Sequence, residues 1–600
     1  MSSKELKTRD QIDKKYKWNI EAMIPDESVI EGQLAECKEA AERYADKFTG
    51  HLADSAEMLL EAFAEKDEIW RKVEKIYVYA HMKRDENNAE SRYQGMTDQA
   101  IACISSISAL LSFFTPELIE ADEETVLGYI ESCEGLKTYE FAIKDTLREK
   151  QHILSQAEEA ILAQMGEITG ATNNIFTMLN NADIKFGTIR DEEGNEVELT
   201  HGNYINFMES HDREVRKAAY EKLYETYKGL INTISTTYSY NTKTDVIGAR
   251  IRKYESARAA ALSGDNIDGS VYDNLIAEVN NNLPSLHRYI ELRKKILGYD
   301  KMFMSDIYVP LIELPDKKVS FEEGLDIMRQ ALKPLGEEYI AKMNEGISQG
   351  WIDVYENKGK TSGAYSFGCY DSYPYILLNY TDKLKDVFTI IHEMGHSMHS
   401  KYTREVQPYI YGSHSIFTAE VASTVNESLL MKHLLANETD KEMRKYLLNL
   451  YLEEFRATLF RQTMFAEFED ITHNAIESGQ VLTGEWMNQQ YQALNDKYYG
   501  PAVEKDEYIK YEWARIPHFY NAFYVYKYAT GYSAATAISS KILNEGQPAA
   551  DAYIEFLKTG ESDYPIELLK IAGVDMSSPE PVKAAMAEFN RILDEFESLL

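Results

Sequence analysis

The sequence predicts a mostly α-helical protein with one small β-sheet. Apolar residues recur at three- and four-residue spacing through most of the chain, which is typical of amphipathic helices. Only two stretches have β-like composition, and 14 prolines and 31 glycines among 600 residues leave little room for long linkers. A chain of this length forms roughly two to four domains, or one large helical body that encloses a site.

The first part of the chain, residues 28–180, is predicted to be a succession of helices. Residues 182–200 then alternate apolar and polar side chains around EEGNE, which is typical of a β-hairpin with a tight turn. We therefore predict an N-terminal helical domain, 1–200, that ends in this hairpin. The remaining region, 201–600, resumes helical periodicity and carries the sequence motifs described below.

A second β-like stretch, SGAYSFGCYDSYPYILLNY, spans residues 362–380 and is rich in aromatic residues and glycine. We expect a small sheet here, followed by helices to the end of the chain. An edge strand of such a sheet can bind a peptide through main-chain hydrogen bonds. Gly363 and Gly368 would let a substrate backbone approach closely, although glycines in ordinary turns of a sheet are the alternative.

The helix expected after this sheet contains HEMGHSMH, residues 392–399, with three of the 13 histidines of the chain. His392 and His396 are four residues apart, so both rings emerge on one face of the helix and can hold a single ion. Glu393 lies one step round the helix, from where it can reach a water on that ion without being a ligand. This HExxH pattern favours zinc.

The third ligand is less obvious, and two residues are candidates. His399 is seven residues from His392, roughly 10.5 Å along the helix axis, which is far for one ion that also binds His396. Glu420 lies on the next predicted helix among small apolar residues, TAEVAST, and is the better candidate. His399 would then form hydrogen bonds nearby. Glu427, on the same face as Glu420, could orient a ligand histidine or lie on the surface.

HEMGHSMH followed by AEVAST resembles the thimet oligopeptidase group of zinc peptidases, and most closely its bacterial branch, oligoendopeptidase F. Segments YKWNI, LSGDNI (262–267) and RIPHFYNAFYVYKYATG (515–531) also resemble that branch and occur in its order, so the resemblance covers nearly the whole chain. It implies a large, two-lobed helical enzyme with an enclosed central channel that admits short peptides. It also implies one zinc ion per chain, held by two histidines and a downstream glutamate that match His392, His396 and Glu420.

Segment 515–531 has a further implied role. We expect a helix between Pro517 and Gly531, with Tyr524 and Tyr528 one turn apart on one face. In the resembled family, a histidine and tyrosines of the corresponding segment contact the substrate and the transition state. Matched by position, with an adjustment of one residue, these are His518, Tyr524 and Tyr528. An aromatic helix packed in a core is the alternative.

The predicted function is zinc-dependent hydrolysis of internal peptide bonds in short peptides. Water activated by zinc would attack the scissile carbonyl, with Glu393 as general base and then general acid. One alternative is a helical zinc carboxypeptidase or dipeptidase, which would contain the same HExxH pattern. Another is a non-catalytic peptide-binding protein with structural zinc. Glu393 argues against this second alternative. A structural site fills all four coordination positions with protein ligands and does not need a glutamate between them.

The composition limits partners and compartment. The net charge of −35 argues against nucleic acid and anionic membranes as partners. Four widely spaced cysteines without a CxxC pair argue against a disulfide framework. The N-terminus lacks the apolar segment of a secretory signal, and the apolar run 107–114 is too short to span a membrane. We therefore expect a cytoplasmic protein that acts on peptides; its oligomeric state is not predicted.

Overall fold

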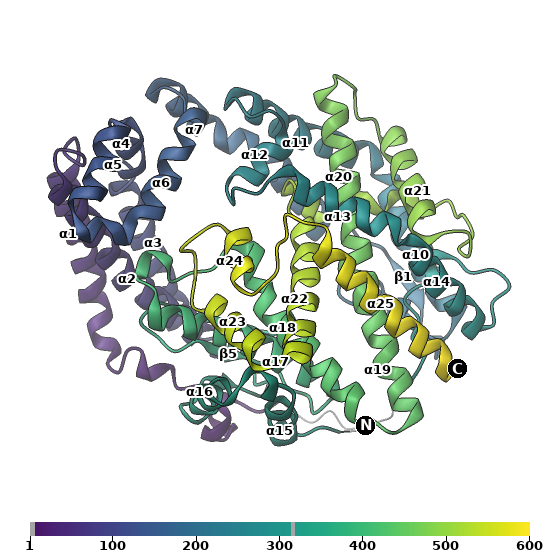
Figure 1. Ribbon diagram of the computed structural model, residues 1–600. Helices are drawn as coiled ribbons and strands as arrows, with labels where there is room; N and C mark the ends of the chain where they lie inside the picture. Colours follow the sequence, from purple (N-terminus) through teal and green to yellow (C-terminus); the bar gives the residue numbers. More distant parts are fainter. Residues whose placement is uncertain (1–5, 314–317) are drawn as a thin grey trace. The chain divides into compact units, whose positions relative to one another are not determined.

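The structure is a computed structural model that describes residues 6–313 and 318–600, and the chain divides into two compact units (Figure 1). Unit 1 comprises Met1–Gln151, Asp316–His433 and Ile538–Val574. Unit 2 comprises His152–Pro315, Leu434–Ala537 and Asp575–Leu600. The chain therefore passes between the units repeatedly, and the predicted boundary at residue 200 lies inside unit 2.

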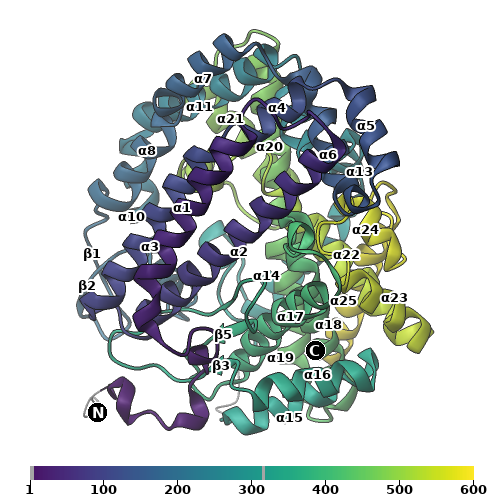
Figure 2. The ribbon, with the colours of Figure 1, turned by 90° about the vertical axis from the view of Figure 1, so that its left-hand side faces the viewer.

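The N-terminal part of unit 1 is helical, as predicted. Its helices are α1 (Ile30–Phe48), α2 (Ala56–Glu86), α3 (Ser91–Leu110), α4 (Phe114–Glu120), α5 (Glu123–Ser132) and α6 (Glu140–Arg148). In α1, Leu34, Ala41 and Tyr44 recur at helical spacing and are buried, which gives the helix one apolar face. That face packs against α2 and α3, and the three long helices lie side by side in Figure 2.

One stretch of the described residues, Ser91–Glu120, is apolar and long enough to cross a membrane by length and composition alone. It is not one continuous helix, because α3 ends at Leu110 and α4 begins at Phe114. Ala100 and Ile107 of α3 are fully buried in the core formed with α1 and α2. A core helix of a globular protein passes the same test, so this stretch is weak support for a membrane span.

The sheet predicted in residues 362–380 is present in unit 1. Strand β5 (Tyr375–Leu377) lies in the middle, with β4 (Tyr365–Phe367) antiparallel and β3 (Ile352–Asp353) parallel to it. All three residues of β5 are buried, whereas those of β4 are half-buried. Strand β4 pairs only with β5 in this sheet, so it is an edge strand. Strand β3 was not predicted, because two residues give no periodicity.

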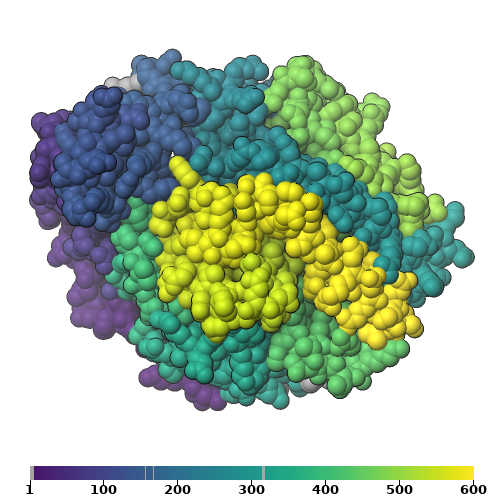
Figure 3. Space-filling view, in the orientation of Figure 1, coloured from purple at the N-terminus to yellow at the C-terminus, as the bar shows by residue number. Residues whose placement is uncertain are grey.

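Two long helices follow the sheet, α17 (Leu384–Val406) and α18 (Ile416–Asn437). Asp386 fixes the start of α17, since its carboxylate accepts hydrogen bonds from the backbone N–H groups of Thr381 and Lys383. Near α17 lie β4, β5 and α23 (Gln547–Leu557), as Figure 1 shows. Helices α15 (Phe321–Ala331), α16 (Glu337–Ser348) and α24 (Pro565–Ile571) belong to the same unit, and α23 and α24 form part of the yellow area at the centre of Figure 3.

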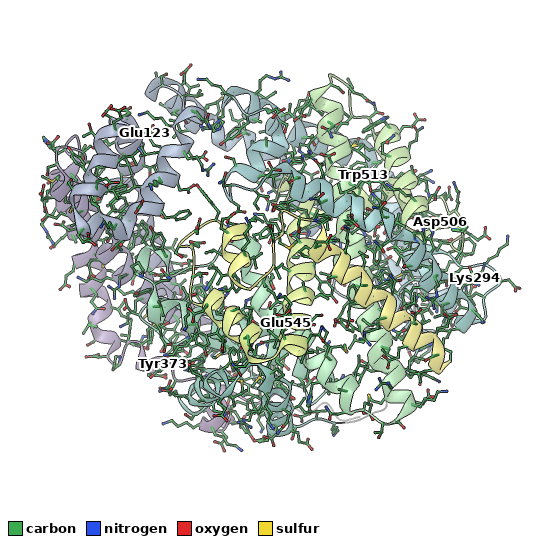
Figure 4. The ribbon with its side chains drawn as sticks, viewed as in Figure 1. Glu123, Lys294, Tyr373, Asp506, Trp513 and Glu545 are labelled. Atoms are coloured by element: carbon green, nitrogen blue, oxygen red, sulfur yellow. The ribbon has the colours of Figure 1, made fainter. Side chains whose placement is uncertain are left out.

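Unit 2 contains the predicted hairpin, formed by β1 (Thr188–Arg190) and β2 (Glu196–Glu198). Its helices are α7 (Gln156–Thr169), α8 (Ala171–Met178), α9 (Tyr204–Met208), α10 (Arg213–Gly229), α11 (Ile231–Ile251), α12 (Ala257–Ser263), α13 (Gly269–Asn281), α14 (Leu283–Leu297), α19 (Lys441–Glu454), α20 (Arg461–Glu477), α21 (Gly484–Tyr499) and α25 (Glu580–Leu599). Trp513, labelled in Figure 4, stacks on Phe468 of α20 with ring centroids 6.2 Å apart, within an aromatic core.

The prediction of one helix from Pro517 to Gly531 is wrong at both ends. Pro517–Tyr520 forms only a short 3-10 helix, residues 521–525 form a turn, and α22 (Tyr526–Glu545) begins after it and continues through Gly531. The residues after Gly531 keep forming helix, and one interior glycine costs a helix only about 1 kcal/mol. His518 and Tyr528 therefore lie on separate elements joined by a turn.

Candidate metal centre and active site

His392 and His396 face each other on α17 of unit 1. Their Nε2 atoms lie 3.2 Å apart, and the ring centroids are 4.9 Å apart with the planes at 80°. Most residues around them on this helix are buried, whereas the two histidines are half-buried and remain accessible. The sequence predicted this arrangement from the four-residue spacing.

Glu420 of α18 completes a group of three. Its Oε2 lies 3.6 Å from Nε2 of His392 and 3.6 Å from Nε2 of His396. Among the described residues, this is the group whose donor atoms all lie within 4.8 Å of one another. Ligands at 2.0–2.2 Å from a tetrahedral zinc ion are separated by roughly 3.3–3.6 Å, so these three donors fit zinc in type and spacing.

The two helices can approach this closely because residue 395 is glycine. A Cβ atom there would lie 2.6 Å from Cα of Ser423 and 2.7 Å from the carbonyl oxygen of Ala422. The fully buried Asn426 of α18 also links the two helices, because its side-chain amide donates to the carbonyl of Ile391 on α17 at 3.2 Å. Gly395 therefore sets the distance between the histidines on α17 and the glutamate on α18.

We expect Gly395→Ala to weaken metal binding sharply. The added methyl group meets backbone atoms, which cannot rotate away, so α17 and α18 must separate and carry Glu420 away from the histidines. Overpacking of this kind costs about 1–3 kcal/mol of stability. Zinc titration and thermal unfolding of the purified variant would measure both effects. A variant with wild-type zinc affinity would show that the helices separate without disturbing the site.

Each histidine ring also has a partner outside the triad. Nδ1 of His392 lies 3.2 Å from Oε1 of Glu427, and the His396 ring is hydrogen-bonded to the carbonyl of Ala419. Burial lowers the pKa of His392, but the hydrogen bond and charge of Glu427 outweigh it and raise this pKa to about 9. Burial and the neighbouring His392 lower the pKa of His396. Such partners fix ring orientation and tautomer in metal sites.

Glu393 interacts with the charged groups of this triad and also with strand β4. It is 7% exposed, and burial raises the pKa of its carboxyl group to about 7. The nearby backbone N–H of Ser366 offsets part of this rise. The hydroxyl of Ser366 in turn lies 2.8 Å from that of Ser397 on α17. Strand β4 therefore contacts α17 at two places, through Ser397 and through Glu393, which is the residue predicted to move protons.

The other site residues predicted in unit 1, His399, Gly363 and Gly368, lie outside the triad. His399 is buried against His414 and Phe556, with ring centroids 3.7 and 5.4 Å away, and is not part of the triad. Gly363 is exposed and has no atom within 4 Å of a Cβ position. Gly368 sits in a tight turn, where a Cβ would lie 2.6 Å from the carbonyl oxygen of Tyr373.

His518, Tyr524 and Tyr528 form a second group, in unit 2. The His518 ring centroid lies 6.0 Å from that of Tyr524 and 5.9 Å from that of Tyr528, and the two tyrosine rings are 5.5 Å apart. The Tyr528 hydroxyl is 3.4 Å from Nε2 of His518. His518 is exposed, and partial burial lowers its pKa, which favours the neutral ring at neutral pH. Tyr520 is buried on Phe176 instead, with centroids 4.4 Å apart.

Sequence reasoning overlooked three contributors to the site: Gly395, Asn426 and Ser366. The glycine inside HEMGH was a visible signal, since glycine in the middle of a helix is unfavourable unless something approaches closely. Asn426 lies one turn from Ala422 and Leu430 on α18, and a buried amide on such a face needs a partner. Nothing in the local sequence marks Ser366, whose role depends on how the sheet packs against α17.

Known proteins resemble this chain over nearly its whole length. The model of peptidase family M3 matches residues 206–588, and that of oligopeptidase F matches residues 117–186. Oligopeptidase PepF of Bacillus subtilis is 48% identical over 596 residues, covering 99% of this chain and 89% of the relative. Group B oligopeptidase PepB of Streptococcus agalactiae is 43% identical, covering 99% and 98%.

A solved structure agrees with these sequence matches. The crystal structure of oligoendopeptidase-F from Enterococcus faecium superposes with a TM-score of 0.75 at 39% identity and covers 95% of this chain and 98% of that one. The match confirms the mostly helical fold with small sheets that the sequence predicts. With the family models and the relatives, it establishes that this chain is a member of peptidase family M3, of the oligopeptidase F type.

Proposed function

We propose that this metallopeptidase cleaves internal bonds of short peptides with one zinc ion per chain, held by His392, His396 and Glu420. The observation that carries the assignment is the near-equal separation of the three donor atoms, 3.2, 3.6 and 3.6 Å. Zinc held there supplies Lewis acidity and a water that is nucleophilic at neutral pH. Cobalt or manganese would fit the same donor types, so metal identity also depends on availability.

Glu393 is the proposed proton carrier. Its carboxyl group is buried and interacts with His392, and a pKa raised to about 7 lets it both accept and release a proton near neutral pH. It would take the proton of the attacking water and deliver it to the leaving amine. The hydrogen bond from the N–H of Ser366 keeps the carboxylate aimed while the proton moves.

Other chain residues are proposed to bind and orient the peptide. Strand β4 is an edge strand, and a substrate that extends the sheet there would hydrogen-bond to main-chain groups and tolerate varied sequences. The exposed Gly363 leaves space for that backbone. Gly368 is better explained by the tight turn that it allows. We propose that Glu427 orients His392, while the buried His399 stabilises the helix beneath the site.

His518, Tyr524 and Tyr528 are proposed to donate hydrogen bonds to the oxygen of the scissile carbonyl as charge develops on it. The neutral His518 ring carries one N–H, and each tyrosine carries one hydroxyl, so the group offers up to three donors. Their rings already lie within about 6 Å of one another. Removing one such donor typically lowers kcat by about 10²–10³-fold.

The test uses purified protein and a quenched fluorescent peptide of about ten residues, with product masses determined by mass spectrometry. We expect cuts at internal bonds, loss of activity with a chelator, and recovery with added zinc. Products shortened from one end only would instead indicate a carboxypeptidase or dipeptidase. Bound zinc without any cleavage would indicate a peptide-binding protein.

The proposed setting of the enzyme is the cytoplasm, with free peptides as substrates. Four widely spaced cysteines, Cys37, Cys103, Cys133 and Cys369, without a CxxC pair support a reducing compartment. The net charge of −35 disfavours nucleic acid and anionic membranes as partners.

A further inference from the structure

A fully buried carboxyl group lies beneath the turn that connects His518 to Tyr528. Glu469 of α20 is 0% exposed, and its Oε1 accepts a hydrogen bond of 2.9 Å from the backbone N–H of Phe523. Its other oxygen, Oε2, is buried without a hydrogen-bond partner. A buried carboxyl group with one oxygen unsatisfied is costly, and an apolar side chain of similar size would stabilise the fold more.

Phe523, whose N–H bonds to Glu469, has an unfavourable backbone conformation. Phe523 has φ +54°, in the left-handed region that bulky residues rarely adopt. Its ring is buried against His473 of α20 and Tyr272 of α13, with centroids 4.5 and 5.7 Å away. Such strain persists only where the surrounding contacts impose it, and it concentrates at functional sites.

The strained residue lies within the group formed by His518, Tyr524 and Tyr528. It directly precedes Tyr524 and separates His518 from Tyr528, so its backbone angles determine how the two tyrosines meet the histidine. A second tether acts on the far side of the turn, where the ammonium group of Lys527 lies 2.7 Å from Oδ2 of Asp265 in the segment LSGDNI. Both contacts lie within unit 2.

The surroundings of Glu469 disfavour its charged form. Burial raises its pKa well above the ordinary value, and the nearby carboxylates of Asp245 and Asp470 raise it further, against the hydrogen bond from Phe523. The ring of His473 bonds to the backbone carbonyl of Glu469, through Nδ1, rather than to its side chain. A neutral carboxyl group still accepts the N–H of Phe523 through its carbonyl oxygen.

We propose that Glu469 is a positioning residue for peptide hydrolysis: it holds the turn 521–525 in its strained form, so that His518, Tyr524 and Tyr528 converge. The inference rests on the proposed role of these three side chains. It assigns a purpose both to the buried carboxyl group and to the left-handed phenylalanine, neither of which the metal site requires.

The first experiment compares Glu469→Gln with Glu469→Met. Glutamine keeps an acceptor of the same shape, so we expect kcat within about twofold of wild type. Methionine fills the space but accepts no hydrogen bond. The turn should then relax, and kcat should fall about 10–100-fold, by analogy with the loss of one oxyanion donor. KM and zinc content should change little, and the melting temperature should not fall. Asn474→Ala, an exposed change on the same helix, is the control.

A double variant separates positioning from a general loss of structure. If Glu469 acts through Tyr528, Glu469→Met should lower kcat far less in a Tyr528→Phe background than in wild type. Independent losses that multiply would overturn the inference, as would a Glu469→Met variant with normal kcat. If Glu469→Met does not fold, Glu469→Asp, which withdraws the carboxyl group by one methylene, should lower kcat in the same way.

The outcome also separates this inference from the function on which it rests. Normal kcat in Glu469→Met, with reduced kcat in Tyr528→Phe, would remove the positioning role and leave the role of the tyrosine intact. Normal kcat in His518→Ala, Tyr524→Phe and Tyr528→Phe alike would instead remove the proposed role of that group, and the positioning role with it.

Discussion

Glu393→Gln is expected to retain zinc and to lose most of its peptidase activity. The amide has nearly the same shape as the carboxyl group, so its oxygen can still accept the N–H of Ser366 and keep the side chain in place. It cannot take up a proton at neutral pH. Loss of a general base lowers kcat by about 10²–10⁴-fold. Cleavage of a quenched fluorescent peptide and the metal content of the same preparation would be measured together.

Two further variants make this result specific. Glu393→Asp keeps a carboxylate but shortens it by one methylene, so we expect activity between that of the wild type and that of Glu393→Gln. Glu405→Gln removes a carboxylate of the same helix that pairs with Lys342 and Lys401, and it should leave kcat unchanged. Substantial turnover by a zinc-loaded Glu393→Gln protein would show that another group accepts the proton.

Local features of the fold could be predicted because their causes are local. The spacing of His392 and His396 places two rings on one face of any helix that contains it. The hairpin around residues 188–198 follows from alternation on both sides of a glycine-containing turn. The segment TAEVAST, which the sequence assigns to the next helix, lies within α18.

The contacts between distant segments could not be predicted from the same patterns. The choice between His399 and Glu420 depends on how closely α17 and α18 pack, and a glycine in the sequence does not say which neighbour needs the space. The turn at Phe523 escaped prediction for a related reason. Aromatic residues at helical spacing favour a helix through the whole segment, but Glu469, 54 residues earlier in the chain, stabilises a left-handed residue within it.

Glu420→Ala is expected to cause the largest loss of zinc among single changes on α18. It removes one of three donors and leaves two rings whose Nε2 atoms, 3.2 Å apart, repel each other if both are protonated. Changes to outer-shell partners typically weaken metal binding by about 10–100-fold, so loss of a direct ligand should exceed about 100-fold. Competition with a chromophoric chelator would give the affinity, and activity should return partly at high zinc concentration.

A graded series distinguishes the ligand from its neighbours. Glu427→Gln keeps an acceptor for Nδ1 of His392 but removes its charge, so its zinc affinity should fall between those of Glu420→Ala and wild type. His399→Ala should bind zinc as wild type does, because the ring packs against His414 and Phe556 instead. The reverse order, with zinc lost in His399→Ala and retained in Glu420→Ala, would make His399 the third ligand. It would also mean that α17 bends enough to bring a residue two turns from His392 to the same ion.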